Sequence, residues 1–504
     1  MAFEPIFEAA KFDSLKRLCS SQAVVEAKLM PSSGVALAKI LSIATDVTVS
    51  PGEVFAGEAR YAGRVSFKVI FTDPDGAAHS MDYNADFTDK LVCDDITAKV
   101  RPSVSAAILD TDIVAVDERE IKLACVVEVN LDAVVCECAD ILVKGGENVY
   151  THEDRFEYSR LTAESAENFT VSDVFRDVKY ADVLLSEPRI VVTGACAGVD
   201  CAVVEGKIIC DLVCECEDNM LTSYRGVTPF TQEVAAPGAE HGNLAVASAS
   251  VGGYRISPES DGDSAAISAD YTVVLDVKVF SQAEAAPVTD AFSVTHELLT
   301  ERETLKICRS KLFICISDRV DGAVTLDQNM PLADNILAVT GSRLTLANVA
   351  AGAGKVTFEG VASCSIIYYA AESDSKNSVA VELPFSFTTN AAVREGDEIT
   401  AKGIVTAVAA RIRRGNEIDI KADIEIEMRA AEVETRSVIT RLALGEERAL
   451  PTSAFGIHVA KGGETLWDVA KALGTTPEIV LLQNPKLSLP LSGGERVIAY
   501  RHLK

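Results

Sequence analysis

The stretch that decides the fold class is Ile418-Asp419-Ile420-Lys421-Ala422-Asp423-Ile424-Glu425-Ile426-Glu427-Met428. Apolar and charged residues alternate along it, and successive side chains of a β-strand point to opposite faces. We therefore expect a half-exposed antiparallel strand with one apolar and one charged face. The turn Arg414-Gly415-Asn416 separates it from another apolar run, residues 405–412, so the sequence predicts a hairpin here.

The same two-residue period extends through most of the chain. From about Val24 onward, alternating runs are separated by glycine, Asp-Gly and proline for some 400 residues. This pattern predicts a mainly β fold. The N-terminus differs, because the spacing of its apolar residues predicts a short helix within residues 3–20. These apolar residues are Phe7, Ala10, Phe12, Leu15 and Leu18.

Three landmarks recur in the same order within the β-rich region: an apolar pair, a glycine that opens a long strand, and a Phe-Thr dipeptide. From the apolar pair to Phe-Thr the spacing is 47, 47 and 51 residues, and from the glycine to Phe-Thr it is 24, 24 and 27. Such regularity indicates an internal repeat. The three sets are Ile40-Leu41, Gly63 and Phe87-Thr88; Val183-Leu184, Gly206 and Phe230-Thr231; and Ile336-Leu337, Gly360 and Phe387-Thr388.

We therefore predict three tandem, sandwich-like copies of one β-domain, at residues 1–145, 146–290 and 291–440. The first copy would include the N-terminal helix. Residues 441–455 are expected to form a linker, which would let the last segment, residues 456–504, move relative to the rest.

The last segment has a different pattern. Residues 457–459 form a short strand candidate, and residues 496–500 form a return strand after a Gly-Gly turn. Between them, Thr465 and Asp468 have the spacing of a capping box, and Gly474 can end that helix. Thr476 can cap a second helix, with proline at its first position. The sequence therefore predicts the order strand, helix, helix, strand.

This segment resembles the LysM module. The resemblance is carried by Gly463-Glu464-Thr465-Leu466-Trp467-Asp468-Val469-Ala470, by the apolar run that ends in Asn484-Pro485, and by Ser492-Gly493-Gly494-Glu495-Arg496-Val497-Ile498. It departs from the family where an aromatic residue is usual in the first strand and where proline is usual before the last turn. LysM modules typically bind N-acetylglucosamine glycans in a groove between two loops.

The resemblance implies which residues line that groove. They would bind either a glycan or a partner: Gly463, Glu464, Thr465, Leu466, Trp467, Asn484 and Pro485. Structural roles compete with this interpretation. Thr465 is a helix cap in either case, Trp467 can pack in a core instead of forming a sugar platform, and Asn484 can satisfy loop backbone groups.

Composition narrows the class of partner and the location. The chain has 504 residues and a formal net charge of −28, which disfavours nucleic acid and anionic lipid as partners and suits a basic protein partner. The N-terminus carries no secretory signal pattern, and no run is long enough to span a bilayer. We therefore expect a cytoplasmic protein whose thirteen cysteines are reduced and buried.

No motif for catalysis, metal or cofactor binding emerges. Residues 351–357 superficially resemble a phosphate loop, but the positions where that loop needs glycine and a hydroxyl residue, 349 and 356, are both valine. The Cys-x-Cys pairs Cys136/Cys138 and Cys214/Cys216 do not have zinc-knuckle spacing. The six histidines lie in no known catalytic context. We expect neither an enzyme nor a cofactor.

Three repeats followed by one LysM-like module resemble the SPOCS-domain proteins of endospore-forming bacteria. The resemblance implies a mother-cell cytosolic scaffold or adaptor that is recruited to the forespore surface during spore coat assembly. Its LysM-like module would dock a coat-basement ATPase of the SpoIVA type. The repeats could dock partners by sheet-edge addition. The alternative is a protein that binds peptidoglycan through the same module.

Overall fold

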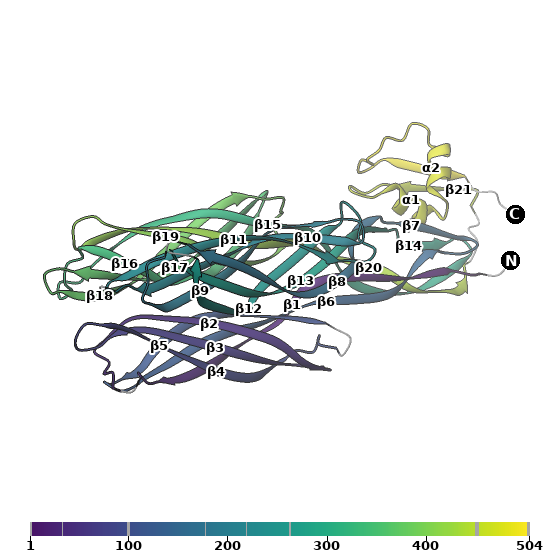
Figure 1. The fold of residues 1–504 in the computed structure, drawn as a ribbon. Helices are drawn as coiled ribbons and strands as arrows, with labels where there is room; N and C mark the ends of the chain where they lie inside the picture. The colour runs from purple at the N-terminus through teal and green to yellow at the C-terminus, as the bar shows by residue number, and fades with distance from the viewer. Residues whose placement is uncertain are drawn as a thin grey trace.

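The computed structural model describes residues 3–500 except 33, 98–100, 177, 218, 262–263 and 449–452. The described chain is mainly β, as the alternating pattern predicted, with two short helices near its C-terminus (Figure 1). No helix in this part of the chain is long and apolar enough to cross a membrane.

The first six strands form two three-stranded antiparallel sheets, which we call the first unit. One sheet has the order β1-β6-β5 and the other has the order β2-β3-β4. The strands are β1 (Ile6–Leu29), β2 (Lys39–Phe55), β3 (Glu58–Thr72), β4 (Ala78–Val92), β5 (Pro102–Val116) and β6 (Ile121–Lys144).

This strand order recurs twice. The second unit has the sheets β8-β13-β12 and β9-β10-β11, and the third unit has β15-β20-β19 and β16-β17-β18. The second unit consists of β8 (Phe156–Phe175), β9 (Asp182–Ala197), β10 (Cys201–Glu215), β11 (Leu221–Ala235), β12 (Leu244–Asp261) and β13 (Ser264–Ala285). The third unit consists of β15 (His296–Thr325), β16 (Asn335–Gly352), β17 (Lys355–Ala370), β18 (Ser375–Asn390), β19 (Glu398–Ile412) and β20 (Glu417–Glu447).

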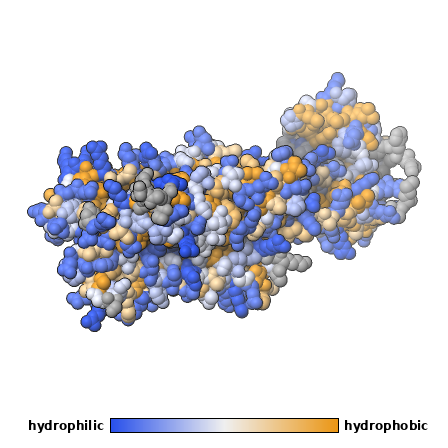
Figure 2. Space-filling model, in the orientation of Figure 1, coloured by the Kyte–Doolittle hydropathy of each residue, from blue (hydrophilic) through white to orange (hydrophobic). Residues whose placement is uncertain are grey.

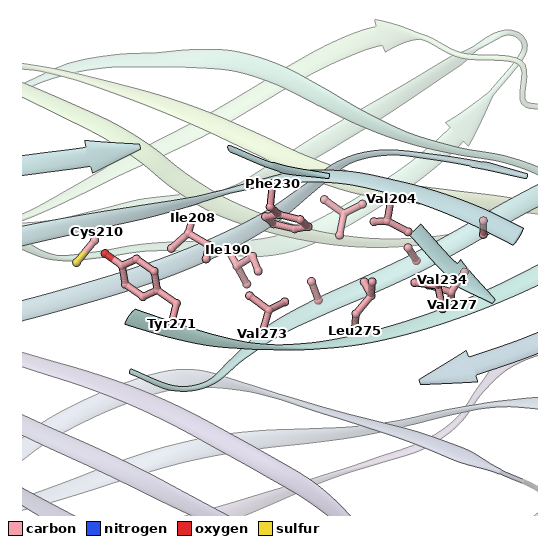
Figure 3. Close-up of a cluster of buried hydrophobic side chains, with 14 of the residues drawn as sticks. Ile190, Val204, Ile208, Cys210, Phe230, Val234, Tyr271, Val273, Leu275 and Val277 are labelled. Atoms are coloured by element: carbon pink, nitrogen blue, oxygen red, sulfur yellow. The ribbon is translucent and has the colours of Figure 1, made fainter. Parts of the chain in front are cut away.

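Each unit closes around its own hydrophobic core. In the second unit, Val204 and Ile208 of β10 meet Val273 and Leu275 of β13 between the two sheets (Figure 3). All four side chains are fully buried. Burying a side chain of this size stabilises a fold by about 1.5–3 kcal/mol, so the alternating apolar residues hold the two sheets together.

The glycine and Phe-Thr landmarks form cross-strand pairs. Gly63 lies opposite Phe87, and Gly206 lies opposite Phe230. A methyl group on either glycine would come within 2.4 Å of the facing ring. The ring therefore fills the space that a side chain would occupy, an arrangement that protects a glycine within a sheet.

The third copy of this landmark was misassigned from the sequence. Gly360 lies opposite Phe385, not Phe387, and Phe387 pairs with another position of β17. The Phe-Thr dipeptide was the wrong marker, because the function of the landmark is to place an aromatic ring over the glycine. A methyl group on Gly360 would lie 2.9 Å from the Phe385 ring.

The apolar pairs mark the contact between units. Leu41, Leu184 and Leu337 each come from one unit and meet in one buried cluster, together with residues of the central strands β3, β10 and β17. A second cluster joins the first strands of the units through Phe12, Phe156 and Leu305. The three units therefore pack side by side around shared apolar contacts, and their strands run along a common long direction (Figure 1).

Carboxylates also form hydrogen bonds between the second and third units. Glu427 of the third unit accepts a hydrogen bond from the backbone nitrogen of Val192 at 2.7 Å. Glu187 of the second unit accepts one from the backbone nitrogen of Gly341 at 2.9 Å. Burial raises the pKa of both carboxyls above the ordinary value, although nearby cations oppose this effect.

The predicted N-terminal helix is wrong. Residues 6–29 form β1, which pairs with β6 along almost its whole length. The spacing of the apolar residues fits a strand with irregularities, because the register shifts between Ile6 and Phe7 and between Arg17 and Cys19. Phe12 faces the second and third units rather than a helix partner. Tertiary pairing with β6 therefore determines the local structure.

The predicted linker is wrong over its first half. Residues 441–447 continue β20 and pair with the start of β15. Leu442 is buried, and Arg441 pairs with Glu301 at 2.9 Å. Of the rest of the predicted linker, residues 449–452 lie outside the described residues.

The thiols are less buried than expected. Cys136 and Cys138 are both exposed, with their sulfur atoms 3.5 Å apart on one face of β6, whereas Cys214 is buried. Residues 136 and 138 lie in the part of β6 that extends beyond the core of the first unit.

A small C-terminal module, Phe455–Tyr500, completes the fold. It consists of β21 (Phe455–Val459), α1 (Leu466–Leu473), α2 (Pro477–Gln483) and β22 (Arg496–Tyr500), in the predicted order. Its own core includes Val469, Val480 and Val497. The module lies over a two-stranded sheet of β7 (Val149–Glu153) and β14 (Val288–Ser293), at one end of the body (Figure 1).

Candidate docking site in the C-terminal module

The loop between β21 and α1 is held by the predicted capping box. The Thr465 hydroxyl accepts a hydrogen bond from the backbone nitrogen of Asp468 at 3.2 Å, and the Asp468 carboxylate accepts one from the backbone nitrogen of Thr465 at 2.8 Å. Gly463 has a φ of +86°, and a methyl group on it would meet no atom within 4 Å, so this turn both requires glycine and leaves open space. Thr465 therefore acts as the helix cap of α1, the structural role expected for it beside ligand binding.

Glu464 is also engaged within its own loop. Its carboxylate accepts a hydrogen bond from the backbone nitrogen of Lys461 at 2.8 Å and lies 2.8 Å from Nε2 of His458. These bonds, the one with His458 first, lower the pKa of the Glu464 carboxyl. His458 of β21 thus helps to orient the loop.

Asn484 ties α2 to β22. Its side-chain nitrogen donates to the backbone oxygens of Val480 at 2.8 Å and Ile498 at 2.7 Å, and its side-chain oxygen accepts from the backbone nitrogen of Ile498 at 2.9 Å. Both hydrogens of the amide nitrogen and one acceptor position of the oxygen are therefore used to join α2 to β22. Pro485 follows it on an exposed turn.

The two predicted groove loops do approach each other. A methyl group on Gly493 would lie 3.3 Å from the backbone nitrogen of Gly462. The backbone of Ala460 also bonds to Glu495 and Gly494 at 2.8 Å. Leu466 packs against the same small core as Leu487 of the second loop. The structure thus brings Gly463, Glu464 and Thr465 to one loop, with Leu466 at the start of α1 directly after it, and places Asn484 and Pro485 where the other loop begins.

Trp467 faces the body of the protein. Its indole nitrogen donates a hydrogen bond to the carboxylate of Asp290 at 2.8 Å. Its ring packs edge-on against Phe292, with centroids 5.0 Å apart, and lies 5.3 Å from the ring of His152. These partners belong to β14 and β7. The one tryptophan of the chain is therefore a docking contact between the module and the body.

Asp290 is the centre of this contact. Lys471 of α1 donates to both of its carboxylate oxygens, at 2.9 and 2.7 Å, and Arg302 of β15 lies 3.3 Å away. Burial raises the pKa of the Asp290 carboxyl, but the hydrogen bonds from Lys471 and Trp467 outweigh burial, so the pKa lies below its ordinary value. Asp290 is therefore a carboxylate at neutral pH.

The module also exposes an apolar surface that the sequence reasoning missed. We call it the apolar face: it is the outer side of the β21–β22 sheet. Phe455 pairs with Tyr500 across the two strands, and Ile457 pairs with Ile498. Phe455, Ile457, Val459 and Tyr500 are 54%, 56%, 52% and 64% exposed. Figure 2 shows hydrophobic surface gathered over this module.

The apolar face had a sequence signal. In Phe455-Gly456-Ile457-His458-Val459 every second residue is apolar, which predicts a strand with one apolar side. That side could be assigned to the interior or to solvent only once the packing was known. The buried residues of β22, Val497 and Ala499, fill the inner side instead.

Two of the cavities in the described part of the body are lined by charged side chains. One, of about 570 Å³, lies between the first and third units and is lined by Lys16, Arg17 and Arg429 among others. In the other, of about 380 Å³, arginines and glutamates pair with each other, for example Arg309 with Glu157 at 2.6 Å. Among the described residues, no group of histidine, cysteine and acidic side chains is placed to hold a metal ion.

Comparisons with known proteins found no matching family model, no matching curated protein and no matching solved structure.

Proposed function

We propose that the protein is a non-enzymatic scaffold or adaptor of spore envelope assembly. In this proposal the three units are copies of a SPOCS-like β-domain, and residues 456–504 form a LysM-like module. The identical strand order of the three units and the strand-helix-helix-strand order of the module support this assignment. The protein would act in the mother-cell cytoplasm, at the forespore surface.

We propose further that the module docks a coat-basement partner protein, an ATPase of the SpoIVA type. The apolar face is the observation that carries this proposal. Exposed apolar patches rimmed by polar residues are typical of protein interfaces, and aromatic residues such as Phe455 and Tyr500 are enriched in the anchors of such interfaces. A glycan would instead need convergent polar groups beside an aromatic platform.

The alternative function, binding of peptidoglycan glycan, rests on the loop between β21 and α1. The open space beside Gly463 and the exposed Thr465 leave room for a ligand there. Against this alternative, Trp467 is used in docking to the body, and Asn484 and Glu464 are bound within the module. Few free polar groups remain to recognise a sugar.

Binding of the full chain to each target tests the choice. We expect saturable binding to the purified ATPase and no cosedimentation with purified peptidoglycan. Ile457→Lys places a charge on the apolar face and should weaken ATPase binding at least tenfold, about 1.4 kcal/mol. Val199→Lys is the matched control, because Val199 is 65% exposed on a hairpin of the second unit. It should change binding less than twofold.

The thermal midpoint of each variant separates binding from folding. Ile457 is half-exposed, so the midpoint of Ile457→Lys should match that of the unchanged chain. Tight, saturable binding to peptidoglycan that is lost in Thr465→Ala but not in Ile457→Lys would favour the glycan alternative.

A further inference from the structure

The last part of β5 is an open sheet edge. β5 lies at the edge of the sheet β1-β6-β5, and within the described residues its ladder partner is β6 alone. Its first half is covered: Ile108 is buried, and Thr111 bonds to Thr45 of β2 at 3.0 Å. Residues 112–119 are all exposed. The strand therefore continues past the covering sheet into solvent.

Exposed apolar residues follow Asp112 at this edge. Ile113, Val114 and Val116 are 48%, 62% and 46% exposed. The ladder to β6 skips one residue between Ile113 and Ala115, so Val114 stands in a bulge. We call residues 112–116 the β5 edge. Exposed apolar edge strands are templates for pairing with another chain, and proteins usually protect them with charges or proline.

The other two units protect the equivalent edge. In the second unit the corresponding strand is β12, and its exposed end carries Pro258 and Glu259. In the third unit it is β19, which has the exposed Arg411 next to its last residue and is followed by the exposed Arg413. Proline cannot extend a ladder, and a charge on the edge opposes pairing. The β5 edge has one charge, Asp112, at its start, and residues 113–116 that follow contain neither proline nor a charged residue.

We propose that the β5 edge docks an extended segment of a partner protein by strand addition, and that this segment carries basic residues on either side of an alternating apolar core. Backbone groups of β5 would supply the ladder, and the side chains of Ile113, Val114 and Val116 would supply the apolar contact. This surface is separate from the apolar face of the C-terminal module.

The acidic residues that flank the β5 edge favour a basic partner segment. Asp110 and Asp112 precede the exposed apolar residues, and Asp117 and Glu118 follow them, all exposed. A basic segment would meet opposite charges at both ends. A second copy of this chain, paired antiparallel about Val114, would bring Asp110 toward the acidic residues Asp117 and Glu118 of the other copy, and like charges held close together repel each other.

Fluorescence anisotropy tests the proposal with two labelled nine-residue peptides and the full chain. Both peptides alternate valine and threonine in the centre. One has two lysines at each end and the other has two glutamates. We expect the lysine peptide to bind at least tenfold more tightly than the glutamate peptide. Equal binding of both, or no binding of the lysine peptide, would overturn the proposal.

A variant places the binding at the β5 edge. Val114→Lys gives β5 the protection that β19 has and should weaken binding of the lysine peptide at least tenfold. Ala409→Lys on the exposed end of β19 is the matched control and should change binding less than twofold. The thermal midpoint of both variants should stay unchanged, because both positions are exposed.

Two further measurements show where the peptide binds and whether a second copy of the chain binds there instead. Amide hydrogen exchange of residues 112–116 should slow when the lysine peptide is bound, and slowing confined to the C-terminal module would refute the proposal. In sedimentation velocity, we expect the unchanged chain to form no dimer through the β5 edge. A dimer of the unchanged chain that is absent in Val114→Lys would show such pairing. Such a dimer would identify a second copy of the chain as the occupant and would overturn the choice of a basic partner segment.

Discussion

Replacement of Asp290 by asparagine should release the C-terminal module from the body. Asp290 accepts the indole hydrogen bond of Trp467 and two bonds from Lys471. In Asp290→Asn the side chain keeps its size, so the packing of Phe292 against Trp467 is preserved. The negative charge and one of the two acceptor oxygens are lost.

The magnitude follows from these contacts. A hydrogen bond to a charged group contributes about 1.5–3 kcal/mol and a neutral one about 1 kcal/mol, so the indole bond should weaken by about 1 kcal/mol. The pair with Lys471, which is 43% exposed, adds about 0.2–1 kcal/mol. Together the docked state should lose about 1–2 kcal/mol, which is roughly a 5- to 30-fold change in the docking equilibrium.

Fluorescence measures this equilibrium directly, because Trp467 is the single tryptophan of the chain. In the docked state its ring is half-buried between Phe292 and His152. We expect Asp290→Asn to shift the emission maximum to longer wavelength and to increase quenching by acrylamide. The same emission and quenching in both proteins, at low and at physiological salt, would refute the docking contact.

The same reporter gives the pH dependence of docking. The pKa of Asp290 is lowered in the docked state, so docking is stable above the ordinary pKa of the free carboxyl and is lost as the pH falls through the lowered value. Fluorescence should therefore stay constant from neutral pH down to about pH 5, and undocking should appear only in stronger acid. Undocking between pH 7 and 5 would contradict the assignment of Asp290.

Three other substitutions test the fold. Gly206→Ala would place a methyl group 2.4 Å from the ring of Phe230. It should destabilise the chain by about 1–3 kcal/mol, measured by urea unfolding. Gly194→Ala is the control, because a methyl group there would meet no atom within 4 Å, and it should be neutral or slightly stabilising. The raised pKa of Glu427 means that its ionised form destabilises the folded chain at neutral pH. The thermal midpoint of Glu427→Gln should therefore equal or exceed that of the unchanged chain at pH 7.5, and the difference should shrink by pH 5. A lower midpoint of the variant at pH 7.5 would contradict this. Asn484→Asp removes two donated hydrogen bonds within the C-terminal module. It should lower the stability of the module by about 2 kcal/mol or more, measured by the fluorescence of Trp467 on heating. An unchanged thermal transition would refute the scaffold role of Asn484.

Local patterns predicted much of the fold. The alternation in residues 418–428 corresponds to β20, and the turn at Arg414–Asn416 joins it to β19 as expected. The helix caps of the module are also where the sequence placed them, at Thr465 and Thr476. In these places the local signal and the tertiary environment favour the same structure.

Where distant contacts decide, the sequence was insufficient. Residues 6–20 have an ambiguous apolar spacing, and β6, more than a hundred residues away, determines that they form a strand. The displaced landmark at Phe387 shows the same limit, because only the register of β17 and β18 shows which ring covers Gly360. Long-range pairing is not encoded in any single window of sequence.

The candidate site shows this limit most clearly. The residue types of the groove were predicted from a resemblance, but the partner of Trp467 is Asp290, which lies far from it in the sequence and belongs to a different part of the fold. The apolar face was not predicted, because the alternation of residues 455–459 does not say which side of the strand is covered. Both findings depend on how the module is placed on the body.

The most direct test of the proposed function is calorimetry of the full chain with the purified coat-basement ATPase at several temperatures. Burial of the apolar face in a protein interface predicts a negative heat-capacity change, and Ile457→Lys should abolish or strongly reduce both the binding and this change. Binding that Ile457→Lys leaves unaffected, or heat released only with soluble peptidoglycan fragments, would contradict the account.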